Sequence, residues 1–165
     1  GVGFSGLQIC KAMFDNEIAV ADIDTQKLKY AKRCGVKSVY NTRENDSVSK
    51  LLKKSKGGVS VVIDFVGSEE SSAFGLASTK RGGKYILVGL YGGQLTVPLA
   101  TIPLRSISII GSLTGSLSET KEFIKLAKKG KIKPIPIEER PMIKVGKTLS
   151  DMRKGSITGR VVLKP

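Results

Sequence analysis

The segment GVGFSGLQICKAMFDNEIAVADID, residues 1–24, decides the fold of this 165-residue chain. It opens with Gly1, Gly3 and Gly6, in the pattern G-x-G-x-x-G. Apolar residues at helical spacing follow, and a short apolar strand at residues 18–21 then ends at Asp22. A glycine-rich turn, a helix, a buried strand and an acid at its end are the ordered parts of a dinucleotide-binding unit.

The glycine pattern predicts a site for a pyrophosphate. The first glycine would form the tight turn, the second would let the pyrophosphate approach the backbone, and the third would let the helix pack closely. Amides at the helix start would then face the phosphates. Asp22 lies 19 residues after Gly3 and would accept hydrogen bonds from the adenosine ribose. A 2′-phosphate would meet Asp22 and Asp24, so we expect NAD rather than NADP. The alternative is a plain turn followed by a loop acid.

The rest of the chain alternates apolar strands with helices of ten or so residues. Strands are predicted at residues 59–66, 84–88 and 107–110, with helices capped by Ser68 and beginning at Ser118. This alternation predicts an α/β fold with a doubly wound parallel sheet, the Rossmann arrangement. After Gly130 the pattern changes, because IKPIPIEERP must be extended and only one more helix and strand follow. We therefore expect a dinucleotide-binding domain at 1–131 and a return segment at 132–165.

One strand of the doubly wound sheet is missing from the pattern. The first strand of that sheet is central, and here the chain starts at the first glycine. The strands at 18–21 and 59–66 would then have no partner between them. Unpaired buried backbone groups cost ~1–3 kcal/mol each, so we expect residue 1 to be a truncation point.

Missing residue types exclude several kinds of chemistry. The chain has no histidine and two cysteines without a CxxC motif. A Ser-His-Asp triad, a histidine base and a Cys- or His-based zinc site are therefore excluded. Cys10 and Cys34, both on predicted helices, are expected to be core residues in a reducing compartment, the cytoplasm. No apolar run approaches the ~20 residues of a membrane helix, so no membrane partner is expected.

The net charge of +14 raises the question of nucleic-acid binding. Aromatic residues make up only 5% of the chain, which is too few to favour a surface on which nucleic-acid bases would stack. Basic pairs instead precede glycines at predicted helix ends, where cations stabilise the helix by ~0.3–1 kcal/mol each. We therefore expect no nucleic-acid partner. These pairs are Lys32-Arg33, Lys53-Lys54, Lys80-Arg81, Lys128-Lys129 and Arg153-Lys154.

Six segments in order resemble the C-terminal half of the medium-chain, zinc-dependent alcohol dehydrogenases, with bacterial and archaeal NAD-linked members most similar. They are GVGFSG, VADIDTQKLKYAKRCGV, VVIDFVGS, GGKYILVGLYGG, SISIIGSLTGS and the closing GKIKPIP…SDMRKGSITGRVVLKP. The resemblance implies hydride transfer between an alcohol or polyol and NAD. It also implies that the zinc ligands and the proton relay lie upstream, in a separate catalytic domain that would contact the alcohol or aldehyde. This chain would then have no catalytic residue, bind no zinc, bind NAD weakly or partially, and be inactive alone.

The resemblance also implies a role for particular residues around NAD. Phe4 and Ser5 would offer backbone amides to the pyrophosphate, and Arg160 would supply a cation. Asp22 would bind the ribose with help from Lys27, and Ile23 would lie against the adenine. Three further segments would run along the cofactor, and they are Phe65, Val66 and Gly67, then Val88, Gly89 and Leu90, then Ser112, Leu113 and Thr114.

The resemblance further implies a homodimer or homotetramer joined through the edge strand Ile107–Ile110. Two other functions remain open at this point. A stand-alone NAD-sensing module would need no return segment, and a nucleic-acid-binding protein would rest on the positive charge. A methyltransferase is a third option, because it also combines a glycine loop with an acid.

Overall fold

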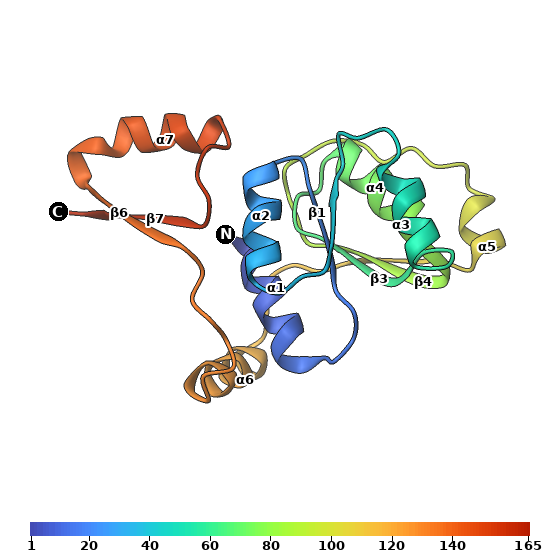
Figure 1. Ribbon diagram of the computed structural model, residues 1–165, viewed down its shortest axis with the longest axis horizontal. Coiled ribbons are helices and arrows are strands. Elements are labelled where there is room, and N and C mark those ends of the chain that lie inside the picture. Colours follow the sequence, from blue (N-terminus) through green and yellow to red (C-terminus); the bar gives the residue numbers. More distant parts are fainter. The chain divides into compact units, whose positions relative to one another are not determined.

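Helices and strands alternate along most of the computed structural model, which describes all 165 residues (Figure 1). The helices are α1 (Val2–Met13), α2 (Thr25–Arg33), α3 (Ser47–Lys54), α4 (Glu69–Ser78), α5 (Thr101–Arg105), α6 (Leu117–Lys128) and α7 (Val145–Arg153), with a 3-10 turn η1 at Met142–Lys144. The strands are β1 (Ala19–Asp22), β2 (Ser38–Asn41), β3 (Val59–Asp64), β4 (Thr79–Leu87), β5 (Ser108–Gly111), β6 (Ile137–Pro141) and β7 (Arg160–Lys164).

The chain divides into two compact units. The first contains residues 1–19, 29–38 and 116–165, and the second contains residues 20–28 and 39–115. The sequence placed a domain boundary at residue 131 instead, and that division stays a prediction.

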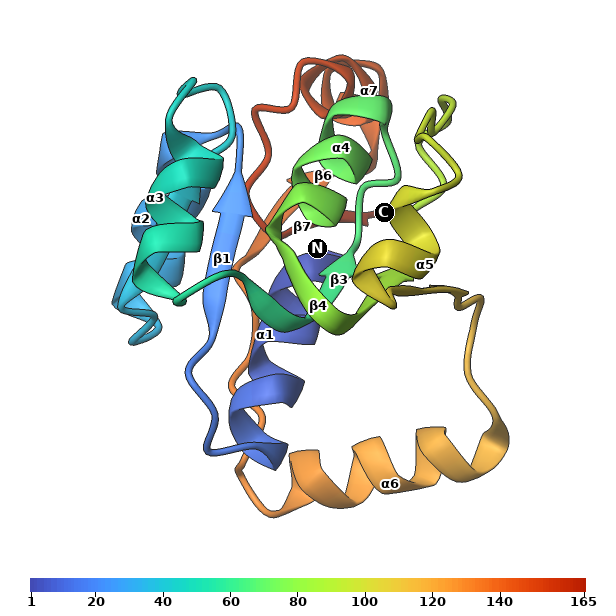
Figure 2. The same cartoon turned by 90° about the vertical axis from the view of Figure 1, so that its right-hand side faces the viewer.

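The main sheet of the second unit is parallel, as the sequence predicted. Strand β4 lies between β3 and β5, with Asp64 level with Leu87 and Leu87 level with Gly111. Figure 2 shows β3 and β4 side by side beneath α4. Strands β1 and β2 form a separate two-stranded sheet. No strand of this chain pairs with both β1 and β3.

Tyr85 of β4 is the centre of the core in the second unit. It is fully buried, and Leu76 of α4 and Ile107 form a cluster with it. Helix α4 comes close to the sheet because Gly75 faces the Tyr85 ring, where an added Cβ would lie 2.6 Å from a ring carbon. The absence of a side chain at Gly75 therefore sets the distance between α4 and β4.

Four of the five basic pairs end helices as predicted. They are followed by glycines with positive φ, which are Gly35, Gly57, Gly130 and Gly155. The prediction was wrong for Lys80-Arg81, since α4 ends at Ser78 and both basic residues belong to β4. The pair precedes a glycine with φ of 71° at Gly82, but this glycine lies within a strand.

Some element boundaries differ from the prediction. Helix α6 begins at Leu117, one residue before the predicted start at Ser118. Ser116 is its cap, because the Ser116 hydroxyl accepts the Glu119 amide and the Glu119 carboxylate accepts the Ser116 amide. Strand β3 ends at Asp64, two residues early, because the Asp64 side chain turns the chain there. Cys34 lies just past α2 rather than within it, and both cysteines are half-buried.

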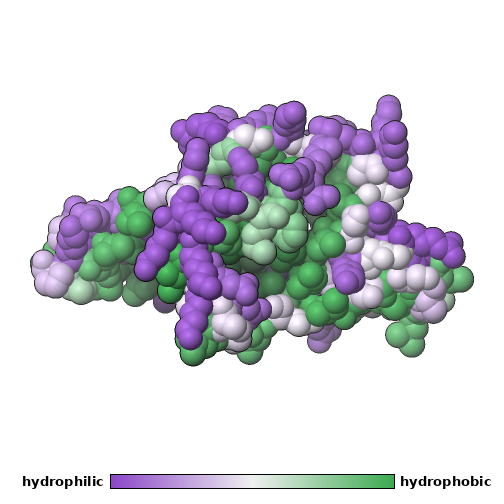
Figure 3. Space-filling model, turned by 90° about the horizontal axis from the view of Figure 1, so that it is seen from below, coloured by the Kyte–Doolittle hydropathy of each residue, from purple (hydrophilic) through white to green (hydrophobic).

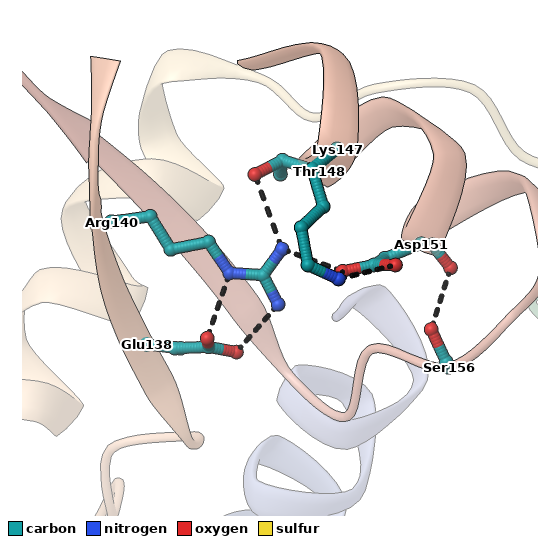
Figure 4. A network of polar contacts seen from close by, with 6 residues as sticks. All are labelled: Glu138, Arg140, Lys147, Thr148, Asp151 and Ser156. Atoms are coloured by element: carbon teal, nitrogen blue, oxygen red, sulfur yellow. Dashed lines mark hydrogen bonds and ion pairs between the residues drawn. The ribbon is translucent and has the colours of Figure 1, made fainter. Parts of the chain in front are cut away.

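A partly buried arginine, Arg140, joins the elements near the end of the chain. Strands β6 and β7 are parallel, and Arg140 of β6 reaches from Glu138 to Asp151 and Thr148 of α7 (Figure 4). Its guanidinium lies 2.7 Å from the Glu138 carboxylate and 2.8 Å from that of Asp151. Arg140 and Asp151 are both largely buried, so this charge-assisted network fixes α7 on the β6–β7 pair.

We expect this network to make the free energy of unfolding decrease as pH falls. Hydrogen bonds from Arg140 hold the pKa of Asp151 and of Glu138 below their usual values. A carboxyl with a lowered folded-state pKa stabilises the fold fully above its unfolded pKa, and this stabilisation is lost as pH falls through the folded pKa. Melting temperatures measured by circular dichroism between neutral pH and about pH 3 should therefore fall less steeply for Asp151→Asn than for the wild type. Parallel curves would contradict this role.

Apolar side chains are exposed beside polar ones on the surface (Figure 3). Within the second unit they include Val61 and Ile63 of β3 and Ile109 and Ile110 of β5, each more than a third exposed. No helix is long and apolar enough to cross a membrane.

Candidate functional site

The N-terminus of α1 has the features of an anion site. Gly1 is the N-cap residue without a side-chain cap, and the first turn carries no acid. The amides of Phe4 and Ser5 donate to the Gly1 carbonyl at 3.1 and 3.2 Å. The amides that helix geometry leaves without an acceptor are therefore those of Val2 and Gly3. The sequence assigned the Phe4 and Ser5 amides to the pyrophosphate, and this assignment stays a prediction, because the glycine pattern does not show which amides the first helical bonds use.

The side chain of Phe4 packs inside the first unit. It is buried and meets the Tyr30 ring edge-on, with ring centroids 4.5 Å apart. The Arg33 guanidinium lies 5.7 Å from the centre of the Tyr30 ring, and burial raises the pKa of the Tyr30 phenol. Phe4 therefore anchors the start of α1 through its side chain.

Arg160 lies against the start of α1. A Cβ added to Gly1 would lie 2.7 Å from Cζ and 2.9 Å from Nε of Arg160. The adjoining Gly159, with φ of 94°, lets β7 come close to Pro136, whose carbonyl accepts the Arg160 amide at 2.9 Å. A helix N-terminus carries about half a positive charge, so a cation beside it is unfavourable unless an anion accompanies both. The arrangement therefore favours a phosphate.

Asp22 ends β1 in the second unit. Its Oδ1 accepts the Asp24 amide at 2.9 Å, and its carbonyl accepts the Thr42 amide. Lys27 pairs with Asp24 at 3.8 Å, so the structure assigns it a partner other than Asp22. Ile23, half-exposed, offers an apolar surface next to the carboxylate. The Asp24 amide orients the Asp22 carboxylate and leaves Oδ2 for an outside donor.

Three of the segments predicted to contact the cofactor begin at the carboxyl ends of β3, β4 and β5, which lie level with one another in the parallel sheet. Segments 65–67, 88–90 and 112–114 follow Asp64, Leu87 and Gly111, which are level in the sheet. Ligands of open parallel sheets bind beyond the carboxyl ends of the strands. The structure thus brings together the residues that the sequence assigned there.

The first two of these segments touch closely. Val88 and Gly89 amides donate to the Asp64 carbonyl at 2.9 and 3.0 Å. Gly67 has φ of 71°, and a Cβ there would overlap the carbonyl of Gly89. The two glycines allow the turns to be in backbone contact.

The third segment holds a strained residue. The Ser112 amide donates to the Leu87 carbonyl at 2.9 Å, while Leu113 is exposed. Thr114 has φ of 57°, the left-handed region that β-branched residues avoid. Strain of this kind is concentrated at functional sites.

The described residues include no cluster of three or more His, Cys, Asp or Glu side chains that could hold a metal ion. A hollow of about 190 Å³ beside Arg140 is lined by both carboxylates and lysines, among them Glu138, Glu139, Lys144 and Lys147. Its opposite charges are near one another, which gives no preference for a charged ligand.

Comparisons with known proteins agree with the geometry. A family model described as zinc-binding dehydrogenase matches residues 1–129. An alcohol dehydrogenase of Geobacillus stearothermophilus is 34% identical over 99% of this chain and 48% of its own length. An NAD-dependent alcohol dehydrogenase of Sulfolobus acidocaldarius is 34% identical over 99% of this chain and 47% of its own length.

A solved structure gives the same result. The crystal structure of the alcohol dehydrogenase from Aeropyrum pernix superposes with a TM-score of 0.92 at 32% identity, over all of this chain and 47% of that one. The chain spans about half the length of the relatives that it matches.

Proposed function

Because the chain belongs to the zinc-binding dehydrogenase family, we propose that it binds NAD as the cofactor-binding part of an alcohol dehydrogenase. The whole protein would transfer hydride between an alcohol or polyol and nicotinamide. NAD supplies the hydride chemistry when bound, and this chain would bind and orient it. Zinc would be held outside this chain, whose residues form no metal cluster.

The observation that carries the proposal is Arg160 beside the start of α1. The helix start and the guanidinium are both positive, and the first turn of the helix contains no acid. A diphosphate satisfies both, because the amides and the guanidinium are hydrogen-bond donors. Asp22 favours NAD over NADP, since a carboxylate accepts ribose hydroxyls and repels a 2′-phosphate.

Calorimetric titration of the 165-residue chain tests the proposal. We expect NAD to bind, NADP to bind more weakly and S-adenosylmethionine not to bind. A chain that binds S-adenosylmethionine in preference to NAD would be a methyltransferase module instead, and duplex DNA that binds regardless of NAD would favour a nucleic-acid function.

Arg160→Gln is expected to weaken NAD binding by roughly fivefold, because it removes about 1 kcal/mol of charged contact to an exposed phosphate. Lys164→Gln is the matched control, since it removes the same charge from the same strand, where Lys164 pairs with Glu139. Titration calorimetry at one ionic strength measures both. Equal losses in the two variants would show only a general effect of net charge.

We also propose that β5 joins two copies of the protein in a homodimer or homotetramer. The strand is an edge of its sheet, pairing only with β4, and Ile109 and Ile110 are over a third exposed. An uncovered apolar edge pairs readily with another strand. A monomer of the intact protein in size-exclusion chromatography would contradict this assembly.

A further inference from the structure

Asp64 is a buried acid that the predicted site does not include. It is the last residue of β3 and is 6% exposed. Burying a carboxylate costs free energy unless its oxygens are satisfied. Each of its oxygens here accepts two hydrogen bonds, and all of these bonds come from uncharged groups.

The side chain of Asp64 holds the turn after β3. Its Oδ1 accepts the amides of Val66 at 2.8 Å and Gly67 at 3.0 Å. Its Oδ2 accepts the hydroxyls of Ser71 and Tyr85, each at 2.8 Å. The carboxylate therefore ties the turn to α4 on one side and to β4 on the other.

The backbone of Asp64 holds the second turn. Its carbonyl accepts the amides of Val88 and Gly89. Tyr91 and Gly92 amides then donate to the carbonyls of Val66 and Gly67, at 3.0 and 3.2 Å. One residue thus positions both turns, and their backbones touch at two glycines, which leaves little room for either turn to shift.

The Tyr85 hydroxyl is a permanent donor to this carboxylate. Burial raises the pKa of Tyr85 to about 12, so the phenol keeps its proton at neutral pH. The Ser72 hydroxyl also lies within hydrogen-bond distance of the Tyr85 hydroxyl, at 3.0 Å between the oxygens. The network is complete without a lysine or arginine.

We infer that Asp64 is a positioning residue that sets the geometry of the two turns facing the cofactor, through hydrogen bonds rather than through its charge. This inference rests on the proposed binding of NAD. It accounts for a buried carboxylate at the carboxyl end of a strand, where two turns must keep their amides and carbonyls in one fixed arrangement.

Two substitutions at this position separate geometry from charge. Asp64→Asn removes the charge but keeps an oxygen for the Val66 and Gly67 amides. Its NH₂ can donate to the Ser71 and Tyr85 hydroxyls, which rotate to accept. Asp64→Ala removes every side-chain bond and leaves two turn amides without a partner.

The experiment measures NAD binding by calorimetry and amide exchange by NMR in the purified chain, or in a full-length protein that contains it. We expect Asp64→Asn to stay within about threefold of the wild type, and Asp64→Ala to bind at least about tenfold more weakly. Exchange at Val66 and Gly67 should be faster by about tenfold in Asp64→Ala only. Leu51→Ala, in the buried face of α3, is the control for lost stability and should leave NAD binding by the folded protein unchanged.

Equal losses in Asp64→Asn and Asp64→Ala would assign the effect to charge and overturn the inference, as would normal NAD binding by Asp64→Ala. If Asp64→Ala does not fold, Tyr85→Phe replaces it. This variant removes one bond to Oδ2 and should loosen Val66 and Gly67 and weaken NAD binding by about threefold, whereas no change in either would overturn the inference. If the wild type binds no NAD, the proposed function fails, and exchange at Val66 and Gly67 still decides whether Asp64 fixes the turn.

Discussion

Asp22→Ala should bind NAD about 10- to 150-fold more weakly than the wild type, because it loses a charged hydrogen bond of about 1.5–3 kcal/mol. Asp22 is the last residue of β1, and its Oδ1 accepts a hydrogen bond from the Asp24 amide. We expect the ribose hydroxyls to donate to Oδ2, with little further ordering of the side chain. Titration calorimetry of the purified chain, or of a full-length protein that contains it, measures the loss.

Asp24→Asn is the matched control for Asp22. It removes an equal charge two residues away, where the carboxylate pairs with Lys27, and its remaining oxygen can still accept the Gln26 amide. We expect this variant to bind NAD within about threefold of the wild type. A second variant at the first position, Asp22→Asn, should also lower the ratio of the NADP dissociation constant to the NAD dissociation constant, since it repels a 2′-phosphate less. Unchanged NAD binding by Asp22→Ala would show that the ribose lies elsewhere.

Gly67→Ala should destabilise the fold by about 3 kcal/mol or more. Two causes add at this position. The residue has φ of 71°, which costs an alanine about 1 kcal/mol. Its new Cβ would also overlap the carbonyl of Gly89, so the two turns would have to separate. Urea unfolding followed by circular dichroism measures the change.

Gly82→Ala separates these two causes. Gly82 has the same φ of 71°, but a Cβ there would meet no atom within 4 Å. This variant should therefore cost only about 1 kcal/mol. The difference between the two variants isolates the contact between the turns after β3 and β4. Equal destabilisation would show that the turns separate without cost, and that their contact does not constrain the backbone of either turn.

Local sequence patterns predicted most of the fold. The apolar runs at 59–66 and 107–110 contain parallel strands, as short apolar runs bounded by turn residues predict, although several of their side chains are exposed. Ser68 caps α4 as predicted, since a cap depends on residues only three positions apart. The prediction failed for the basic pair Lys80-Arg81, because α4 ends at Ser78 and the next residue, Thr79, already pairs with Val59 of β3.

In the candidate site too, local features were predicted from the sequence, while contacts between distant residues were not. The sequence by itself determined the family, the glycine turn, the acid 19 residues on and the order of strands, because each is fixed by spacing along the chain. The resemblance had implied Arg160 as a cation for the pyrophosphate, and the tertiary structure shows it in contact with Gly1, 159 positions earlier. Only the tertiary structure showed that Lys27 pairs with Asp24 and that Asp64 holds two turns. Contacts between distant residues depend on how helices and strands pack in space, and the periodicity of the sequence predicts only the local helices and strands.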